Sequence, residues 1–189
     1  LKLENLTIAS LNKIKIRSNG FRSLDNLKVL TLHTDIETIE SSAFAFDKST
    51  PKMAIIFWSK ILGTFSPTAF SGLKRPTNVG FAYMRLNFIP ENAFKPVLAN
   101  KNNIVLVEST INCTNCLNYW MIKDGRDNQV KNAYCTDDSS KRTNLFSSKT
   151  KSNFKSKCKN GAFGNNQYNT FLICLFVFIN TLVMNIKLT

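Results

Sequence analysis

The chain has 189 residues, and 25 Lys and Arg against 12 Asp and Glu give it a formal net charge of +13. A hydrophobic content of 43% is enough to bury a core, which excludes a wholly disordered chain, and the length allows one or two domains. A single long apolar run excludes a multi-span membrane protein, and seven Gly and five Pro exclude a collagen-like one. The chain starts at Leu1 without an initiator Met or a signal-peptide pattern, so we expect a fragment or a processed form.

Residues 1–110 contain an internal repeat. A small residue followed by Phe recurs, the spacings between these Phe residues are 23, 26 and 24, and an apolar residue lies five positions before each Phe. A period of this length predicts stacked units, each giving one short strand and then returning along an irregular convex side. We expect about four repeats and a final strand at residues 104–107, all in one parallel sheet. The recurring residues, Phe21, Phe44, Phe70 and Phe94, should then form one interior column.

The strand register decides which side chains face solvent. Because side chains alternate along a strand, inward Leu positions leave the residues between them outside. In the register that we expect, the third unit buries Met53, Ile56 and Trp58. Apolar residues at the exposed positions are typical of a protein-contact surface, and the alternative is a shifted register that buries some of them. The expected exposed, concave face consists of Val29, Thr31, His33, Ile55, Phe57, Ser59, Val105 and Val107.

The repeat resembles that of extracellular leucine-rich-repeat proteins, whose units read L-x-x-L-x-L and later I-P-x-x-A-F. The best match is FAYMRLNFIPENAF at residues 81–94, and a second match covers residues 27–44. The resemblance implies an α/β-type solenoid: a right-handed superhelix with short parallel strands, an irregular convex side and a disulfide-bonded C-terminal cap. It also implies protein binding rather than catalysis. Leu11, Asp35 and Ile61 or its neighbours replace the family's Asn after each strand, so we expect its hydrogen-bond ladder to be missing or made by water.

Four cysteines follow the repeats, and the residues alone leave their role open. Four Cys allow three disulfide connectivities. A zinc site usually has two C-x-x-C pairs, and a thioredoxin-like motif needs a strand–helix setting. Only one C-x-x-C is present, from Cys113 to Cys116, so we favour structural disulfides, which fit an oxidising compartment.

The same cysteines resemble the C-terminal cap of the leucine-rich-repeat family, which has a Trp four residues after its second Cys. The resemblance implies a cap made of residues 111–140 and Cys158. The bridges that it implies are Cys113–Cys135 and Cys116–Cys158. It also implies that Trp120 covers the apolar end of the repeats, with Leu117 packed beside it.

A basic neck and polar spacer are expected at residues 141–170. Lys141 to Lys159 contains seven basic residues and no acidic one. The segment is either a solvated stalk or a site of adhesion to anionic glycans or lipid head groups. We expect no nucleic-acid partner, because only Phe146 and Phe154 are available for base stacking and no reader motif is present.

A hydrophobic tail is expected at residues 171–186. As a helix, sixteen residues span about 24 Å, short of the ~30 Å hydrocarbon core. Small residues at 160–162, a spacer and an apolar end together favour a glycosylphosphatidylinositol anchor, with Asn160 as the lipid-bearing residue. A type I span and a tail-anchored protein facing the cytosol remain as alternatives. Two glycosylation sequons, at Asn5 and Asn112, point to the secretory pathway.

Catalysis has few candidate residues in this sequence. His33 is the only His, and no G-x-S-x-G, Walker A or H-E-x-x-H motif is present, so we expect no enzyme, cofactor or metal. We expect a protein-binding or adhesion module on the extracellular face of the plasma membrane, held by a C-terminal lipid anchor or membrane segment. The alternatives are a matrix or non-catalytic assembly subunit and a tail-anchored intracellular leucine-rich-repeat scaffold.

Overall fold

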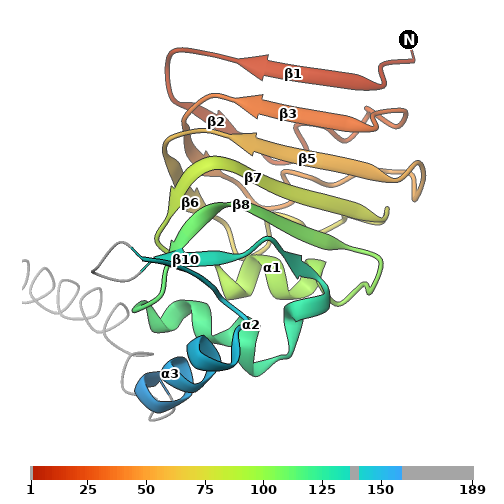
Figure 1. Cartoon of the computed structure of the whole chain (residues 1–189). Coiled ribbons are helices and arrows are strands. Elements are labelled where there is room, and N and C mark those ends of the chain that lie inside the picture. The colour runs from red at the N-terminus through yellow and green to blue at the C-terminus, as the bar shows by residue number, and fades with distance from the viewer. Residues whose placement is uncertain (1, 137–140, 159–189) are drawn as a thin grey trace, which may run out of the picture.

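The computed structural model describes residues 2–136 and 141–158, and its larger sheet has eight, mostly parallel strands (Figure 1). The order is β1-β3-β5-β7-β8-β10-β11, and β9 also pairs with β8. The strands are rich in Val, Ile, Leu, Thr and Phe, which fit a pleated, half-buried surface. Neighbouring strands among the first five pair in parallel, and these strands are β1 (Asn5–Ala9), β3 (Val29–His33), β5 (Met53–Trp58), β7 (Thr77–Leu86) and β8 (Ile104–Asn112).

A second sheet of three parallel strands is formed by β2 (Ile14–Ile16), β4 (Ile36–Ile39) and β6 (Leu62–Phe65). The chain alternates between the sheets, so each of the first three units gives one strand to each. A Cβ at Gly63 would collide with the Glu37 carbonyl oxygen, so β6 needs glycine where it runs beside β4.

In the fourth unit, the segment with the Ala-Phe pair is a helix, α1 (Glu91–Val97). It begins after Pro90, and Glu91 in its first turn suits the positive end of the helix dipole. Lys95 lies one turn later, 3.0 Å from Glu91. Ala93 and Phe94 face the core and are fully buried, so the helix keeps the interior contact that the repeat pattern requires.

The expected column of phenylalanines is present. Ring centroids are 5.9 Å apart for Phe21 and Phe44, 5.0 Å for Phe44 and Phe70, and 5.1 Å for Phe70 and Phe94. The apolar residues five positions earlier, from Ile16 to Ile89, are also buried. Each unit therefore closes its layer against the next, and burial of these aromatic rings contributes much of the core energy.

A buried arginine connects the second and third units. The Arg75 side chain has no exposed surface, and its guanidinium carbon lies 4.1 Å from the centre of the Phe46 ring. Its Nη1 donates to the Leu27 carbonyl oxygen at 2.6 Å, and its Nη2 donates to that of Asp25 at 3.2 Å. Burial lowers the pKa of Arg75 from its ordinary value.

The C-terminal cap packs against β8 at the end of the larger sheet and against α1. Two disulfides join it, Cys113–Cys135 and Cys116–Cys158, as the resemblance to the family's cap implies. Leu117 is an exception to that expectation, because 43% of its surface is exposed and it does not pack beside Trp120 in the interior. The cap elements are η1 (Cys116–Asn118), α2 (Tyr119–Lys123), η2 (Arg126–Asn128), β9 (Val130–Lys131), β10 (Tyr134–Thr136), β11 (Arg142–Asn144) and α3 (Ser148–Cys158).

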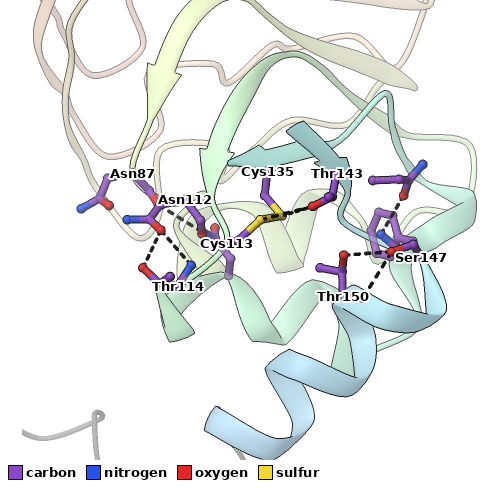
Figure 2. Close-up of a disulfide and its surroundings, with 11 residues drawn as sticks. Asn87, Asn112, Cys113, Thr114, Cys135, Thr143, Ser147 and Thr150 are labelled. Atoms are coloured by element: carbon purple, nitrogen blue, oxygen red, sulfur yellow. Dashed lines mark hydrogen bonds between the residues drawn. A yellow bond between two sulfur atoms is a disulfide. The ribbon is translucent and has the colours of Figure 1, made fainter. Parts of the chain in front are cut away.

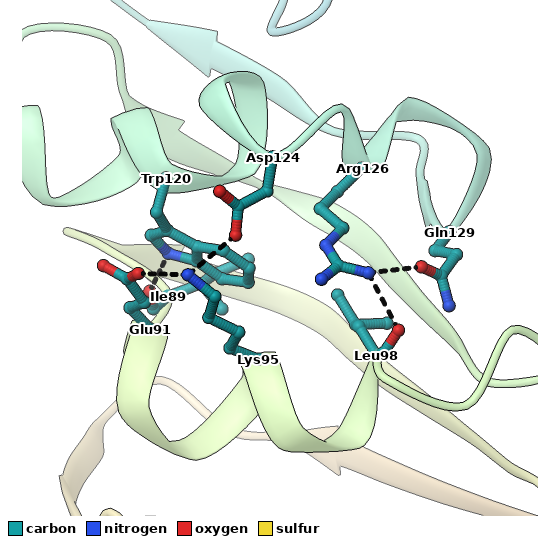
Figure 3. A network of polar contacts seen from close by, with 8 residues as sticks. All are labelled: Ile89, Glu91, Lys95, Leu98, Trp120, Asp124, Arg126 and Gln129. Carbon is teal, nitrogen blue, oxygen red and sulfur yellow. Dashed lines mark hydrogen bonds and ion pairs between the residues drawn. The ribbon is translucent and has the colours of Figure 1, made fainter.

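Trp120 and a group of charged residues hold the cap on α1 (Figure 3). The buried Trp120 ring donates from Nε1 to the Ile89 carbonyl oxygen at 3.0 Å. Lys95 lies between Asp124 at 2.9 Å and Glu91, and hydrogen bonds to these carboxylates raise the pKa of Lys95. Arg126 donates to the Leu98 carbonyl oxygen at 2.9 Å. The last repeat and the cap therefore share both apolar and polar contacts.

The expectation of a mostly parallel sheet with helices and two disulfides is confirmed. Residues 141–158, the described part of the expected basic neck, are not a solvated stalk. Within them, β11 pairs with β10, and α3 buries the side chain of Phe154. In the part of the chain that the structure describes, no helix combines the length and the apolarity needed to cross a bilayer. Asn160, the spacer and the tail at 171–186 lie outside the described residues.

Candidate functional site

The outward face of the larger sheet differs from the expected one in two strands. Val29, Thr31 and His33 of β3 lie on this face, as expected. The other five expected residues are buried, so their assignment to the exposed face is wrong: Ile55, Phe57, Ser59, Val105 and Val107. The outward residues of β5 are Ala54, Ile56 and Trp58, and those of β8 begin with Ile104, Leu106 and Glu108.

Strand pairing explains the correction. In β5 every residue from Met53 to Trp58 is apolar, so its composition fits both registers. Parallel pairing sets Leu30 beside Ile55 and Leu32 beside Phe57, and these residues share the interior. Val79 and Phe81 pair in the same way with Val105 and Val107. A shift of one residue moves every side chain of a strand to the opposite face.

Three exposed aromatic side chains form a row on the corrected face. The ring centroids of His33 and Trp58 are 5.4 Å apart, and those of Trp58 and Tyr83 are 4.8 Å apart in a stacked arrangement. Trp58 exposes 43% of its surface and Tyr83 exposes 75%. We call His33, Trp58 and Tyr83 the aromatic row. It crosses three neighbouring strands where β3 and β5 end, so the backbone of the sheet holds it in place.

A β-bulge in β7 brings Tyr83 into the row. The pairing of β7 with β8 shifts between Ala82 and Arg85, and Tyr83 has a φ of 59°. The Ser109 hydroxyl accepts from the Met84 amide at 3.0 Å and donates to the Phe81 carbonyl oxygen at 3.1 Å. Since the buried Ser109 satisfies both backbone groups, the bulge is a stable part of the strand.

Half-buried apolar side chains continue the surface beside the aromatic row. Ile56 of β5 and Leu106 of β8 lie outward on either side of Gly80. Glu108, one pair further along β8, is exposed and lies opposite Ala82. The face therefore has aromatic and aliphatic groups side by side, with the carboxylate of Glu108 next to them.

Asp35 organises the turns that follow the strands. Its carboxylate accepts from Ser59 Oγ at 3.0 Å, from the Lys60 amide at 3.1 Å and from the Ile61 amide at 3.0 Å. These donors lower the pKa of Asp35, chiefly through the Ile61 amide and the Ser59 hydroxyl. The expected loss of ladder hydrogen bonds is therefore wrong at Asp35, while Leu11 and Ile61 have exposed side chains.

The two sequon asparagines have different surroundings. Asn5 is exposed at the start of β1. Asn112 is half-buried at the end of β8, and its Oδ1 accepts from the Thr114 amide at 2.8 Å and the Thr114 hydroxyl at 2.7 Å (Figure 2). Glycosylation of either residue remains a prediction.

Metal and cofactor chemistry has few candidate groups in the described ranges. Within residues 2–136 and 141–158, no three His, Cys, Asp or Glu side chains are grouped as they would be around a metal ion. The four cap cysteines are in disulfides, and the one imidazole, that of His33, lies tilted against the Trp58 ring.

Sequence reasoning missed Trp58 and Tyr83. The sequence does contain a signal for Trp58. When Ile55 and Phe57 are aligned with the inward residues Leu30 and Leu32 of the second unit, Trp58 falls beside His33. Tyr83 has no comparable signal, since its position depends on the bulge.

Neither the family models nor the curated proteins include a match to this chain.

Proposed function

We propose that the chain is a leucine-rich-repeat solenoid that acts as a non-enzymatic protein-binding or adhesion module at the cell surface. The aromatic row on the outward sheet face is the observation that carries this proposal. Trp and Tyr are enriched at the energetic centres of protein interfaces, because they bury a large area with few rotatable bonds. Here they stand exposed on a rigid sheet, next to apolar side chains.

The arrangement suits a protein partner rather than a small molecule. Trp58 stacks on Tyr83 and contacts the tilted His33 ring on its other side, so the rings are held in place before any partner arrives. A partner therefore loses little side-chain entropy on binding. Ile56 and Leu106 extend the apolar surface, and Glu108 adds an exposed charged group beside it, so apolar and polar groups are combined as in protein interfaces.

Surface display is supported by the cap and by the C-terminal sequence. Two disulfides fit the secretory pathway, and the small residues at 160–162 before the apolar tail fit a lipid anchor on Asn160. A matrix or assembly subunit would use the same face. A tail-anchored scaffold in the cytosol would place the same disulfides in a reducing compartment, which disfavours it.

A panel of extracellular domains from the same organism tests the proposed function, with binding measured by surface plasmon resonance. We expect a partner whose affinity falls about tenfold or more when Trp58→Ala and Tyr83→Ala are combined. The matched control combines Leu11→Ala and Ile61→Ala, which remove two exposed apolar side chains outside the sheet face. A partner that binds both double variants equally well, or a panel without any partner, contradicts the proposal.

A further inference from the structure

A basic hollow lies between α3 and the end of the larger sheet, next to the Cys113–Cys135 disulfide. Its volume is about 210 Å³. Three lysines surround it, and threonine and asparagine side chains lie between them. Its lining residues are Cys113, Thr114, Lys141, Thr143, Lys149, Thr150, Asn153, Phe154 and Lys157.

One wall of this basic hollow is a single face of α3. Lys149, Asn153 and Lys157 recur every four residues, so they lie above one another along the helix. Phe154, which is 2% exposed, stacks parallel to Tyr119 with centroids 6.4 Å apart. The Cys116–Cys158 disulfide holds the last residue of the helix. The wall is therefore fixed in place by an aromatic contact and a covalent bond.

The opposite wall comes from the end of β8 and from β11. Figure 2 shows Thr143 beside the Cys113–Cys135 disulfide, facing Thr150 on α3. The Thr143 hydroxyl lies 3.6 Å from Cys113 Sγ and 3.7 Å from Cys135 Sγ. Sulfur is a weak acceptor, so an anionic oxygen would compete well for this hydroxyl proton.

The charged side chains that line the basic hollow are all lysines. Among the residues that the structure describes, no acidic side chain lines it. Among residues 2–136 and 141–158, no ion pair involves Lys141, Lys149 or Lys157, whereas Lys151 on another face of α3 lies 3.7 Å from Asp127. Three ammonium groups around one concavity repel one another and attract an anion.

We propose that the basic hollow binds a sulfate ester of an acidic glycan chain. Its volume is below the range of about 300–1,000 Å³ of pockets for drug-sized ligands, so it suits one charged group of a larger molecule. The lysines bind the ester oxygens, and the hydroxyls of Thr143 and Thr150 and the Asn153 amide lie beside them.

The choice of a glycan rests on the extracellular location included in the proposed function. A phosphate ester of a lipid head group has the same tetrahedral oxyanion chemistry. Anionic lipids, however, give their negative surface potential to the cytoplasmic leaflet, whereas the two disulfides favour the opposite, oxidising side for this chain. Sulfated glycans are the polyanions that fit that compartment.

Isothermal titration of the purified full chain in nonionic detergent micelles tests the inference, with a sulfated heparin hexasaccharide as the probe. At about 150 mM salt, combining Lys141→Gln, Lys149→Gln and Lys157→Gln should weaken binding about tenfold or more, and a desulfated hexasaccharide should not bind. The matched control combines Lys13→Gln, Lys60→Gln and Lys101→Gln, which remove the same charge from exposed lysines elsewhere. Thr143→Val should weaken binding by a smaller factor.

Two results would overturn the inference. Equal weakening by both triple variants would show that only net charge matters. Lysine-dependent binding of mixed micelles containing phosphatidylserine, without binding of the hexasaccharide, would assign the basic hollow to a lipid head group. Because the titration does not depend on where the protein resides or on the aromatic row, its failure would leave the protein-binding proposal standing.

Discussion

At the residue scale, Asp35 shows how one carboxylate joins two units. It accepts three hydrogen bonds from the turn after β5, including two from backbone amides. Backbone amides in a turn need a partner, and Asp35 supplies it from the preceding unit. The Ser59 hydroxyl also lies 2.6 Å from the Ile61 carbonyl oxygen, so its single proton is shared between that oxygen and Asp35.

The lowered pKa of Asp35 makes part of the stability depend on pH. The folded-state pKa lies below the ordinary value of 3.8, so the ionised carboxylate stabilises the fold above that pH. This contribution is lost as the pH falls from 3.8 through the lower folded-state value. Asp35→Asn should therefore lower the melting temperature at about pH 6, and the difference from the natural chain should close in acid. Calorimetric melts across this range measure it, and an equal difference at both ends would contradict the assignment.

The phenylalanine column and the buried strand residues show what the sequence can predict at this scale. Phe21, Phe44, Phe70 and Phe94 follow from their spacing alone, because each must fill the same place in its layer. Phe57 does not follow, because its neighbours are apolar on both sides and only pairing with Leu32 selects its face. Local pattern therefore finds the layers, while contacts between units decide the register.

At the element scale, α3 is the part of the fold that the sequence predicts least. Its residues are polar or basic apart from Phe154 and Cys158, so no apolar periodicity indicates a packed helix. Its N-terminus is capped, because the Thr150 amide donates to the Ser147 hydroxyl at 3.2 Å, and Lys155 and Lys157 suit its C-terminal end. Because α3 buries few apolar side chains, it is held mainly at its two ends, by the Ser147 cap and by the Cys116–Cys158 disulfide.

The Cys116–Cys158 bridge should control α3 more than the rest of the fold. Replacing both cysteines with Ser should cost about 2–5 kcal/mol of stability and expose the α3 amides to hydrogen exchange. The strands β3 and β5 are far along the chain from this bridge, so their protection should change less. Hydrogen exchange measured by mass spectrometry compares the two regions. Equal loss of protection in α3 and in β5 would mean that the bridge supports the whole fold rather than its end.

At the scale of the whole molecule, an open stack of layers has to be closed where it ends. Trp120 covers the last layer and bonds to Ile89, while β10 pairs with β8. The composition of the cap residues hardly predicts this arrangement. It is implied instead by the resemblance of the four cysteines and Trp120 to the family's cap. The bulge at Tyr83, by contrast, arises from strand pairing and has no local sequence signature.

The two disulfides also support an extracellular location, and their state in the cell tests it directly. The natively expressed chain should be denatured and treated with a maleimide before and after reduction, and its peptides identified by mass spectrometry. We expect Cys113, Cys116, Cys135 and Cys158 to react only after reduction, because all four are paired and a secretory compartment preserves such bonds. Four thiols that react without reductant would place the cap in a reducing compartment. The tail-anchored scaffold would then replace the surface module, because cytosolic thiols could not keep the cap closed by these bonds.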